Sequence, residues 1–101
     1  MVEHIVLLKL KEEATESQTK AILEGLKGLQ NGGSISGIES VSGGYNNSPE
    51  GKGQGYDWGF TLGFATLADR DAYLPHPDHK ALSQDLIRPI VEDVLVFDYE
   101  S

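Results

Sequence analysis

The sequence contains no cysteine and little positive charge, and each shortage removes a class of function. Without cysteine there is no disulfide, no thiolate nucleophile and no Cys-ligated zinc or iron–sulfur centre. Sixteen acidic residues against eight basic ones give a formal charge of −8, which repels phosphate backbones and anionic lipid surfaces. We therefore expect neither nucleic acid nor a membrane as a partner.

Long apolar runs are also missing. No stretch approaches the ~18 apolar residues of a membrane span, and the alternating N-terminal segment follows no basic region, so a signal peptide is not expected. We therefore expect a cytoplasmic protein. The apolar content of 39% is still enough for a modest core, and 101 residues are expected to form a single domain, residues 1–101. A subunit of this size buries a limited area, which makes dimerisation an early expectation.

Alternation with a period of two is typical of a β-strand over residues 2–10. His4 lies on the more apolar of the two faces that this alternation creates. A capping box, in which Gln18 follows three residues after Thr15, predicts a helix over residues 15–30. The Asn31-Gly32-Gly33 segment predicts its end. The apolar stripe of this helix consists of Ile22, Leu26 and Leu29.

The middle of the chain predicts a hairpin. Residues 34–45 carry apolar residues at mixed spacing, which indicates a strand with a bulge or an irregular start. A polar loop over 46–55 precedes an alternating strand over 56–65, whose small face includes Gly59 and Gly63 and is suited to close approach by another backbone or a second sheet. The glycines of GKGQGY resemble a phosphate-binding loop, but they precede a strand, so a hairpin loop is the stronger interpretation.

The last third predicts two helical segments. A helix that starts at residues 66–69 is interrupted by Pro75 and Pro77. Asp78 is suited to cap the next helix, which Pro89 should bend or shorten.

A closing strand over residues 93–99, DVLVFDY, completes the order β-α-β-β-α-β. This order predicts an α+β fold of the ferredoxin-like kind, with a four-stranded antiparallel sheet and helices on one face. The other face is left uncovered. A second subunit that supplies an identical sheet would cover it, because two curved sheets facing each other close into a barrel. We therefore expect a homodimer with a dimeric α/β barrel.

The segment YLPHPDH, from Tyr73 to His79, holds two of the three histidines and is the only concentrated chemical signal. Histidine transfers protons near neutral pH because of its ordinary pKa, and a tyrosine hydroxyl can orient or polarise a substrate oxygen. The prolines hold the turn rigid, which favours a defined arrangement of side chains. Tyr73 and His79 are therefore candidates for an acid/base pair that needs no metal and no cofactor.

Two other interpretations of this turn stay open. In the first, Pro77 and Asp78 set the start of a helix, and His76 and His79 only cap it or pack locally. In the second, His76, Asp78 and His79 bind a metal. The metal interpretation is the weaker one, because no further ligand accompanies this HxxH spacing.

Aromatic residues on the third strand suggest a ligand cavity. His4 would face the same cavity as Tyr56 and Trp58, and with Phe60 this apolar face would enclose a small hydrophobic or aromatic ligand. A single histidine on an apolar face is, however, more often a core residue. The candidate substrate-binding residues are His4, Tyr56, Trp58, Phe60 and His76.

Three segments together resemble the stress-responsive dimeric A/B barrel (Dabb) family: VEHIVLLKLKEEAT, YLPHPDHKAL and RPIVEDVLVFDY. The resemblance covers essentially the whole chain. It implies a ferredoxin-like subunit that pairs its sheet with a second copy to form a β-barrel, sometimes within larger assemblies. The family includes stress-induced plant proteins and also plant polyketide cyclases, which close rings by aldol-type chemistry without cofactors.

The resemblance also implies roles for individual residues. In the cyclase-like members a tyrosine acts with the second histidine of this turn, and these match Tyr73 and His79. His4 and His76 match recurrent family histidines, whereas the third strand carries Trp58 and no histidine.

Three hypotheses about function result. The first is a cofactor-independent cyclase or lyase in which His79 is the general base and Tyr73 hydrogen-bonds the oxygen that becomes negative. The second is a non-catalytic, stress-protective oligomer in which these residues only shape the turn. The third is a monooxygenase or degradative enzyme of a related dimeric barrel type.

Overall fold

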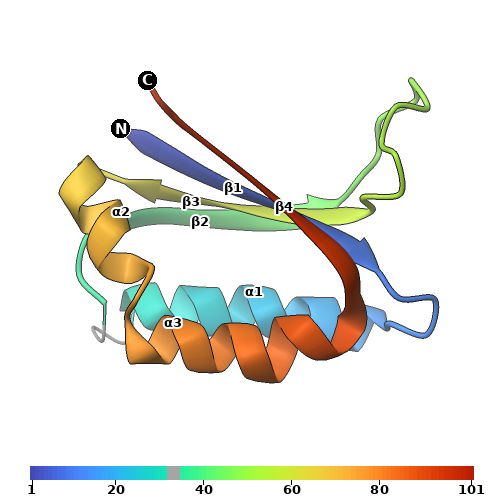
Figure 1. Cartoon of the computed structure of the whole chain (residues 1–101), viewed down its shortest axis with the longest axis horizontal. Helices are drawn as coiled ribbons and strands as arrows, with labels where there is room; N and C mark the ends of the chain where they lie inside the picture. Colours follow the sequence, from blue (N-terminus) through green and yellow to red (C-terminus); the bar gives the residue numbers. More distant parts are fainter. Residues whose placement is uncertain (32–34) are drawn as a thin grey trace.

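Four strands form one antiparallel sheet, and the helices pack on one of its faces (Figure 1). The computed structural model describes residues 1–31 and 35–101. The order of strands across the sheet is β2-β3-β1-β4, which confirms the predicted ferredoxin-like fold. The elements in chain order are β1 (Val2–Leu10), α1 (Glu16–Asn31), β2 (Ile38–Tyr45), β3 (Trp58–Phe64), α2 (Leu67–Tyr73), α3 (Pro77–Leu82), a π turn η1 (Ser83–Ile87), a 3-10 turn η2 (Arg88–Ile90) and β4 (Val91–Glu100).

The capping box at the start of α1 is present as predicted. The Gln18 backbone N–H donates to the Thr15 hydroxyl oxygen at 3.2 Å, and the Thr15 N–H donates to the side-chain carbonyl of Gln18 at 2.8 Å. Ile22 and Leu26 are buried against the sheet. The Gly32-Gly33 part of the predicted stop lies outside the described residues. None of the described helices has the length and apolar content that a membrane crossing requires.

β2 and β3 form the predicted hairpin. The register shifts between Ile38 and Ser40, which is the irregular start that the apolar spacing indicates. In the connecting loop, Gly51 and Gly55 have φ angles of +71° and +89°, a region that favours glycine. These two glycines are therefore explained by the backbone of the loop, which projects from one end of the sheet (Figure 1).

The start of α3 differs from the prediction. Asp78 was expected to be the cap, and this is wrong: the cap is His76, whose Nδ1 accepts a hydrogen bond from the Asp78 N–H at 3.1 Å. Pro77 occupies the first helical position, where its missing N–H has no cost, and the cap therefore falls one residue earlier. The α-helix ends at Leu82 and continues as the turns η1 and η2, of which η2 contains Pro89, so the helix is shortened as expected.

The core lies between the sheet and the helices. Val2, Val6 and Leu8 of β1 are buried there, and His4 is buried in the same row, so the more apolar face of this strand is the one that faces the helices. Burying one large apolar side chain contributes about 1.5–3 kcal/mol relative to leaving it exposed. The other large core residues include Trp58, Phe60, Leu62, Phe64, Ile22, Leu26, Leu82, Ile87 and Ile90.

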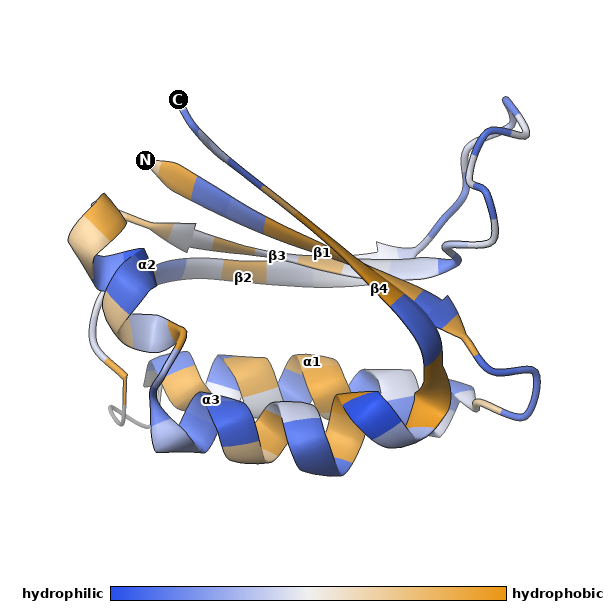
Figure 2. Ribbon diagram, in the orientation of Figure 1, coloured by the Kyte–Doolittle hydropathy of each residue, from blue (hydrophilic) through white to orange (hydrophobic). Residues whose placement is uncertain are grey.

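The opposite face of the sheet has no helix on it. Leu7 pairs there with Leu95 and Ile5 pairs with Phe97, and Phe97 is 61% exposed. The middle of β4 is accordingly one of the hydrophobic stretches in Figure 2. A methyl group at Gly59 would lie 2.8 Å from Cδ2 of Leu7, so a side chain of the same sheet fills the space beside this glycine. We call this surface the open face.

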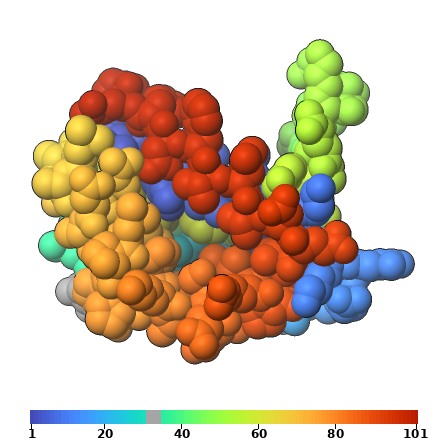
Figure 3. Space-filling model, viewed as in Figure 1, coloured from blue at the N-terminus to red at the C-terminus, as the bar shows by residue number. Residues whose placement is uncertain are grey.

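The edge strand β4 is exposed on its helix-facing side as well. Val94 and Val96 pair with Leu8 and Val6 and share their face, yet they are 41% and 55% exposed. Figure 3 shows the surface hollowed between β4, in red, and the orange helical region below it. Apolar side chains of β4 therefore border this hollow.

Candidate active site at the α2–α3 turn

The turn between α2 and α3 places Tyr73 and His79 face to face. Tyr73 is the last residue of α2, and His79 lies in the first turn of α3. Their ring centroids are 4.2 Å apart, with 32° between the ring planes. His76 lies between them, and its backbone N–H donates to the Tyr73 carbonyl at 3.1 Å. For His76 the structure therefore confirms the capping interpretation, while His79 has an aromatic partner in addition.

One hydrogen bond determines which nitrogen of His79 is basic. Nδ1 lies 2.9 Å from the carbonyl oxygen of Leu74. A carbonyl only accepts, so Nδ1 carries the proton. In the neutral ring Nε2 is then the unprotonated nitrogen and can accept a proton from a substrate.

Burial determines the charge of both members of the pair. Burial lowers the pKa of His79, and nearby His4, His76 and Lys80 lower it further, against the opposing bond to Leu74. His79 is therefore neutral at pH 7 and available as a base. Burial raises the pKa of Tyr73 far above that of a free phenol, so its hydroxyl stays protonated and acts as a hydrogen-bond donor.

A chain of hydrogen-bonded side chains reaches the pair through His4. The His4 ring packs edge-on against Tyr73, with centroids 5.9 Å apart. Its Nδ1 donates to Oδ1 of Asp98 at 2.8 Å, and Nη1 of Arg70 donates to Oδ2 of the same carboxylate at 2.8 Å. Three elements therefore meet here: β1 supplies His4, β4 supplies Asp98, and α2 supplies Arg70.

Three polar atoms of this cluster have no hydrogen-bond partner among the described residues: the Tyr73 hydroxyl and the Nε2 atoms of His4 and His79. No fully enclosed side-chain nitrogen or oxygen of the described residues lacks a partner. Each of the three atoms therefore keeps some contact with solvent, although Tyr73 and His4 are buried as whole residues.

Asp98 and Arg70 were not identified from the sequence. The signal for Asp98 was available, because alternation in the closing strand places it on the same face as Val94 and Val96, where a carboxylate is out of place. Arg70 stands one helical turn before Tyr73, which puts the two on the same side of α2. Neither position shows its partner in the sequence, because the partners come from other elements.

The predicted substrate-binding residues are only partly brought together. His4 pairs with Leu62 in the sheet, whereas Trp58 pairs with Leu8. Four residues of strand separate His4 from that pair, which is about 13 Å at ~3.3 Å per residue. Phe60 lies between these positions on the same helix-facing side.

Tyr56 lies still further along the sheet from His4 than Trp58 does. Its hydroxyl donates to Oδ2 of Asp93 at 2.9 Å, at the loop end of the sheet. This hydrogen bond raises the pKa of Tyr56 and lowers that of Asp93.

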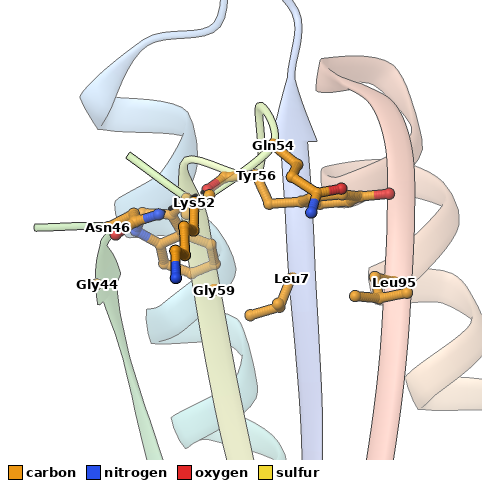
Figure 4. Close-up of a pocket in the computed structure, with 10 residues that line it drawn as sticks. Leu7, Gly44, Asn46, Lys52, Gln54, Tyr56, Gly59 and Leu95 are labelled. Atoms are coloured by element: carbon orange, nitrogen blue, oxygen red, sulfur yellow. Dashed lines mark hydrogen bonds between the residues drawn. The ribbon is translucent and has the colours of Figure 1, made fainter. Parts of the chain in front are cut away.

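Two surface hollows lie near these residues. The larger, of about 480 Å³, is on the open face, where Leu7 and Leu95 lie beside the loop residue Tyr56 (Figure 4). The smaller, of about 320 Å³, is bordered by His79 and by polar residues of α3 and the turns that follow: Lys80, Ser83, Gln84 and Arg88. Of these two hollows, only the smaller one is bordered by a member of the Tyr73–His79 pair, and that member is His79.

The metal interpretation of the HxxH spacing gains no further ligand. Nδ1 of His76 is occupied by the Asp78 N–H, and Nδ1 of His79 by the Leu74 carbonyl. Within residues 1–31 and 35–101, no three His, Asp or Glu side chains gather as they would around a metal ion.

The sequence of this chain is similar to those of known proteins. A family model described as the stress responsive A/B barrel domain (Dabb) matches residues 2–101. The olivetolic acid cyclase of Cannabis sativa is 30% identical over 98 residues, which are 97% of this chain and 94% of the cyclase.

Solved structures agree over nearly the whole chain. The crystal structure of At3g17210 from Arabidopsis thaliana has a TM-score of 0.89 and 25% identity, covering 100% of this chain and 95% of that one. A dimeric ferredoxin-like protein of unknown function from Jannaschia sp. CCS1 has a TM-score of 0.84 and 27% identity, covering 99% and 98% of the two chains.

Proposed function

The chain belongs to the stress-responsive A/B barrel domain family. From this membership and the Tyr73–His79 pair, we propose that it is a cofactor-independent acid/base catalyst. Its proposed reaction closes rings in small carbonyl compounds by aldol-type chemistry. The observation that carries the proposal is the pair itself: a neutral histidine with a free Nε2 stacked on a protonated tyrosine with a free hydroxyl. Similarity to olivetolic acid cyclase supports the reaction class.

The proposed reaction uses one proton twice. Nε2 of His79 removes a proton from a carbon beside a carbonyl group, and the Tyr73 hydroxyl donates a hydrogen bond to the carbonyl oxygen as it becomes negative. The resulting carbon nucleophile attacks a second carbonyl of the same molecule, which forms a carbon–carbon bond and an alkoxide. Nε2–H of His79 returns the proton to this alkoxide, and the histidine is again neutral. The step needs no oxidant, no reductant and no group from outside the chain.

The proposed ligand has an apolar part. Val94 and Val96 are exposed on the helix-facing side of β4, the same side as Asp98 and His4. Figure 3 shows the surface hollowed between β4 and the helical region. A ligand whose carbonyl contacts Tyr73 and His79 would place its apolar part along this side. His4, Phe60 and Trp58 lie on the helix-facing side of the sheet and remain predicted ligand contacts there. Tyr56 and His76 also remain predicted ligand contacts, but they lie away from this side.

The test is turnover of linear 3,5,7-triketo acids and their thioesters, in which C2 can attack the C7 ketone to close a six-membered ring, followed by mass spectrometry of cyclised products. Wild-type protein should cyclise members of this panel, and His79→Ala should lose the activity to background. Lys27→Gln, which changes an exposed residue of α1, serves as the control and should retain it. Equal turnover by wild type and His79→Ala would refute the proposal.

We also propose that two copies pair through their open faces. Phe97, Leu95 and Tyr99 are large and exposed on β4, and a second sheet would cover them together with Leu7 and Ile5. The similar Jannaschia protein is described as dimeric. Light scattering after size exclusion tests this, and a monomer at micromolar concentration would contradict it.

A non-catalytic, stress-protective oligomer is the second candidate. It is favoured by the local hydrogen bonds of the turn, which give His76 and His79 roles in holding α3 in place. This alternative predicts that wild-type protein suppresses heat aggregation of a client enzyme, and that Tyr73→Phe does so equally well. Loss of a carbonyl-compound turnover in Tyr73→Phe, with aggregation behaviour unchanged, would favour the catalyst.

A further inference from the structure

Arg70 is largely buried and is held by two carboxylates, unlike an ordinary surface arginine. Only 19% of its side chain is exposed, and it bonds two carboxylates at once: Nη1 to Asp98 at 2.8 Å and Nε to Asp71 at 2.9 Å. Asp98 is 20% exposed, whereas Asp71 is 64% exposed. The bond to Asp98 is therefore the sheltered one, and Asp71 holds the guanidinium from the solvent side.

Asp98 is shared between Arg70 and His4. Each of its oxygens receives one donor, Oδ1 from Nδ1 of His4 and Oδ2 from Arg70. The carboxylate is thus fixed in orientation by two bonds at once, and it fixes the imidazole in turn. The His4 ring then contacts the Tyr73 ring edge-on, with centroids 5.9 Å apart.

We infer that Arg70 is a positioning residue of the proposed site: through Asp98 it holds His4 with its proton on Nδ1, so that an unprotonated Nε2 faces the ligand beside Tyr73. This inference rests on the proposed acid/base function. Arg70 touches neither Tyr73 nor His79 in any hydrogen bond of the described residues, and its effect passes through the carboxylate.

Hydrogen bonding to Asp98 gives Arg70 its effect. The groups that face His4 are Asp98 from β4, Tyr73 from α2 and the apolar Phe64 of β3, and Arg70 reaches His4 through Asp98. With Arg70 present, both oxygens of the carboxylate have a donor, so Oδ1 stays directed at Nδ1 of His4. Without Arg70, His4 alone would hold the carboxylate, and both the orientation of the imidazole and the preference for a proton on Nδ1 would weaken.

The shape of the side chain matters as well as its charge. A guanidinium reaches Asp71 and Asp98 with two different nitrogens, and a lysine ammonium is a single point charge. Arg70→Lys should therefore keep the charge balance at Asp98 and lose part of the orientation. Arg70→Gln should lose both.

The direct test is a nitrogen-15 spectrum of the histidine side chains, which is simple because the chain has three histidines. In wild-type protein at pH 7, His4 should show one protonated and one unprotonated nitrogen. In Arg70→Gln it should show a mixture of the Nδ1–H and Nε2–H tautomers, and Arg70→Lys should restore most of the wild-type signal. Lys27→Gln removes one positive charge from the exposed face of α1 and should leave the His4 signal unchanged.

A double-mutant cycle separates this role from a structural one. If Arg70 acts through Asp98, Arg70→Gln lowers kcat about tenfold in the wild-type background and has no further effect in an Asp98→Asn background. If the pair only fastens α2 to β4, Arg70→Gln lowers the melting temperature while the His4 spectrum stays as in wild type, and that result would overturn the inference. The spectrum does not require turnover, so absence of any cyclised product would count against the proposed function alone.

Discussion

Replacing Tyr73 by phenylalanine should separate catalysis from stability. The substitution removes one oxygen and keeps a ring that packs against Phe64, His4 and His79, at centroid distances of 5.3, 5.9 and 4.2 Å. The hydroxyl has no hydrogen-bond partner among the described residues, so no bond is lost from the fold. The free energy of unfolding should therefore change by no more than about 0.5 kcal/mol.

The effect on the reaction should be large. In the proposed mechanism the hydroxyl is the donor that stabilises the developing negative oxygen, and removal of one such donor typically lowers kcat by about 10²–10³, or ~2.7–4 kcal/mol of transition-state free energy. The assays are kcat for a cyclising 3,5,7-triketo acid and urea unfolding of the same preparation. Full kcat in Tyr73→Phe would refute the donor role.

Tyr45→Phe is the matched control, with the opposite pattern expected. The Tyr45 hydroxyl bonds Oγ1 of Thr19 at 2.9 Å, at the end of the edge strand farthest from β4. Its loss should cost about 0.5–1.5 kcal/mol of stability and leave kcat unchanged. A stability loss in Tyr73→Phe that matches this control would show that its hydroxyl has an unrecognised structural partner.

Three further predictions address pH, capping and assembly. Because burial holds the pKa of His79 below its ordinary value of 6.5, the acid limb of the kcat/KM profile should lie below pH 6.5. The same lowered pKa stabilises the fold above pH 6.5, and this contribution is lost as the pH falls through the lowered pKa. His79→Gln should therefore flatten the pH dependence of urea unfolding between pH 7.5 and 5. His76→Ala should cost about 0.5–2 kcal/mol of stability and His76→Asn much less, because asparagine also caps helices, and equal melting temperatures would contradict the capping role. Phe97→Glu should convert a dimer to a monomer in light scattering, whereas Lys27→Glu on α1 should not, and a dimer that survives Phe97→Glu would place the interface elsewhere.

Elements with strong local signals were predictable. Strand β1 follows from alternation, α1 from a capping box and an apolar stripe, and the irregular start of β2 from its mixed spacing. The cap of α3 was not, because proline at the first helical position and aspartate at the second compete with a histidine that is an uncommon cap. Arg70 and Asp98 were missed for a different reason, because their hydrogen-bond partners come from other elements of the fold.

Sequence alone determined which segment is the candidate for chemistry, Tyr73 to His79, because no other segment concentrates groups that transfer protons near neutral pH. It could not determine their states. The tertiary structure decided that Nδ1 of His79 is taken by a backbone carbonyl and that the Tyr73 hydroxyl has no hydrogen-bond partner within residues 1–31 and 35–101. It also brought Asp98 from β4 and Arg70 from α2 to His4 on β1. Proton location and charge depend on burial and on partners from other elements, and these arise only when the chain has folded.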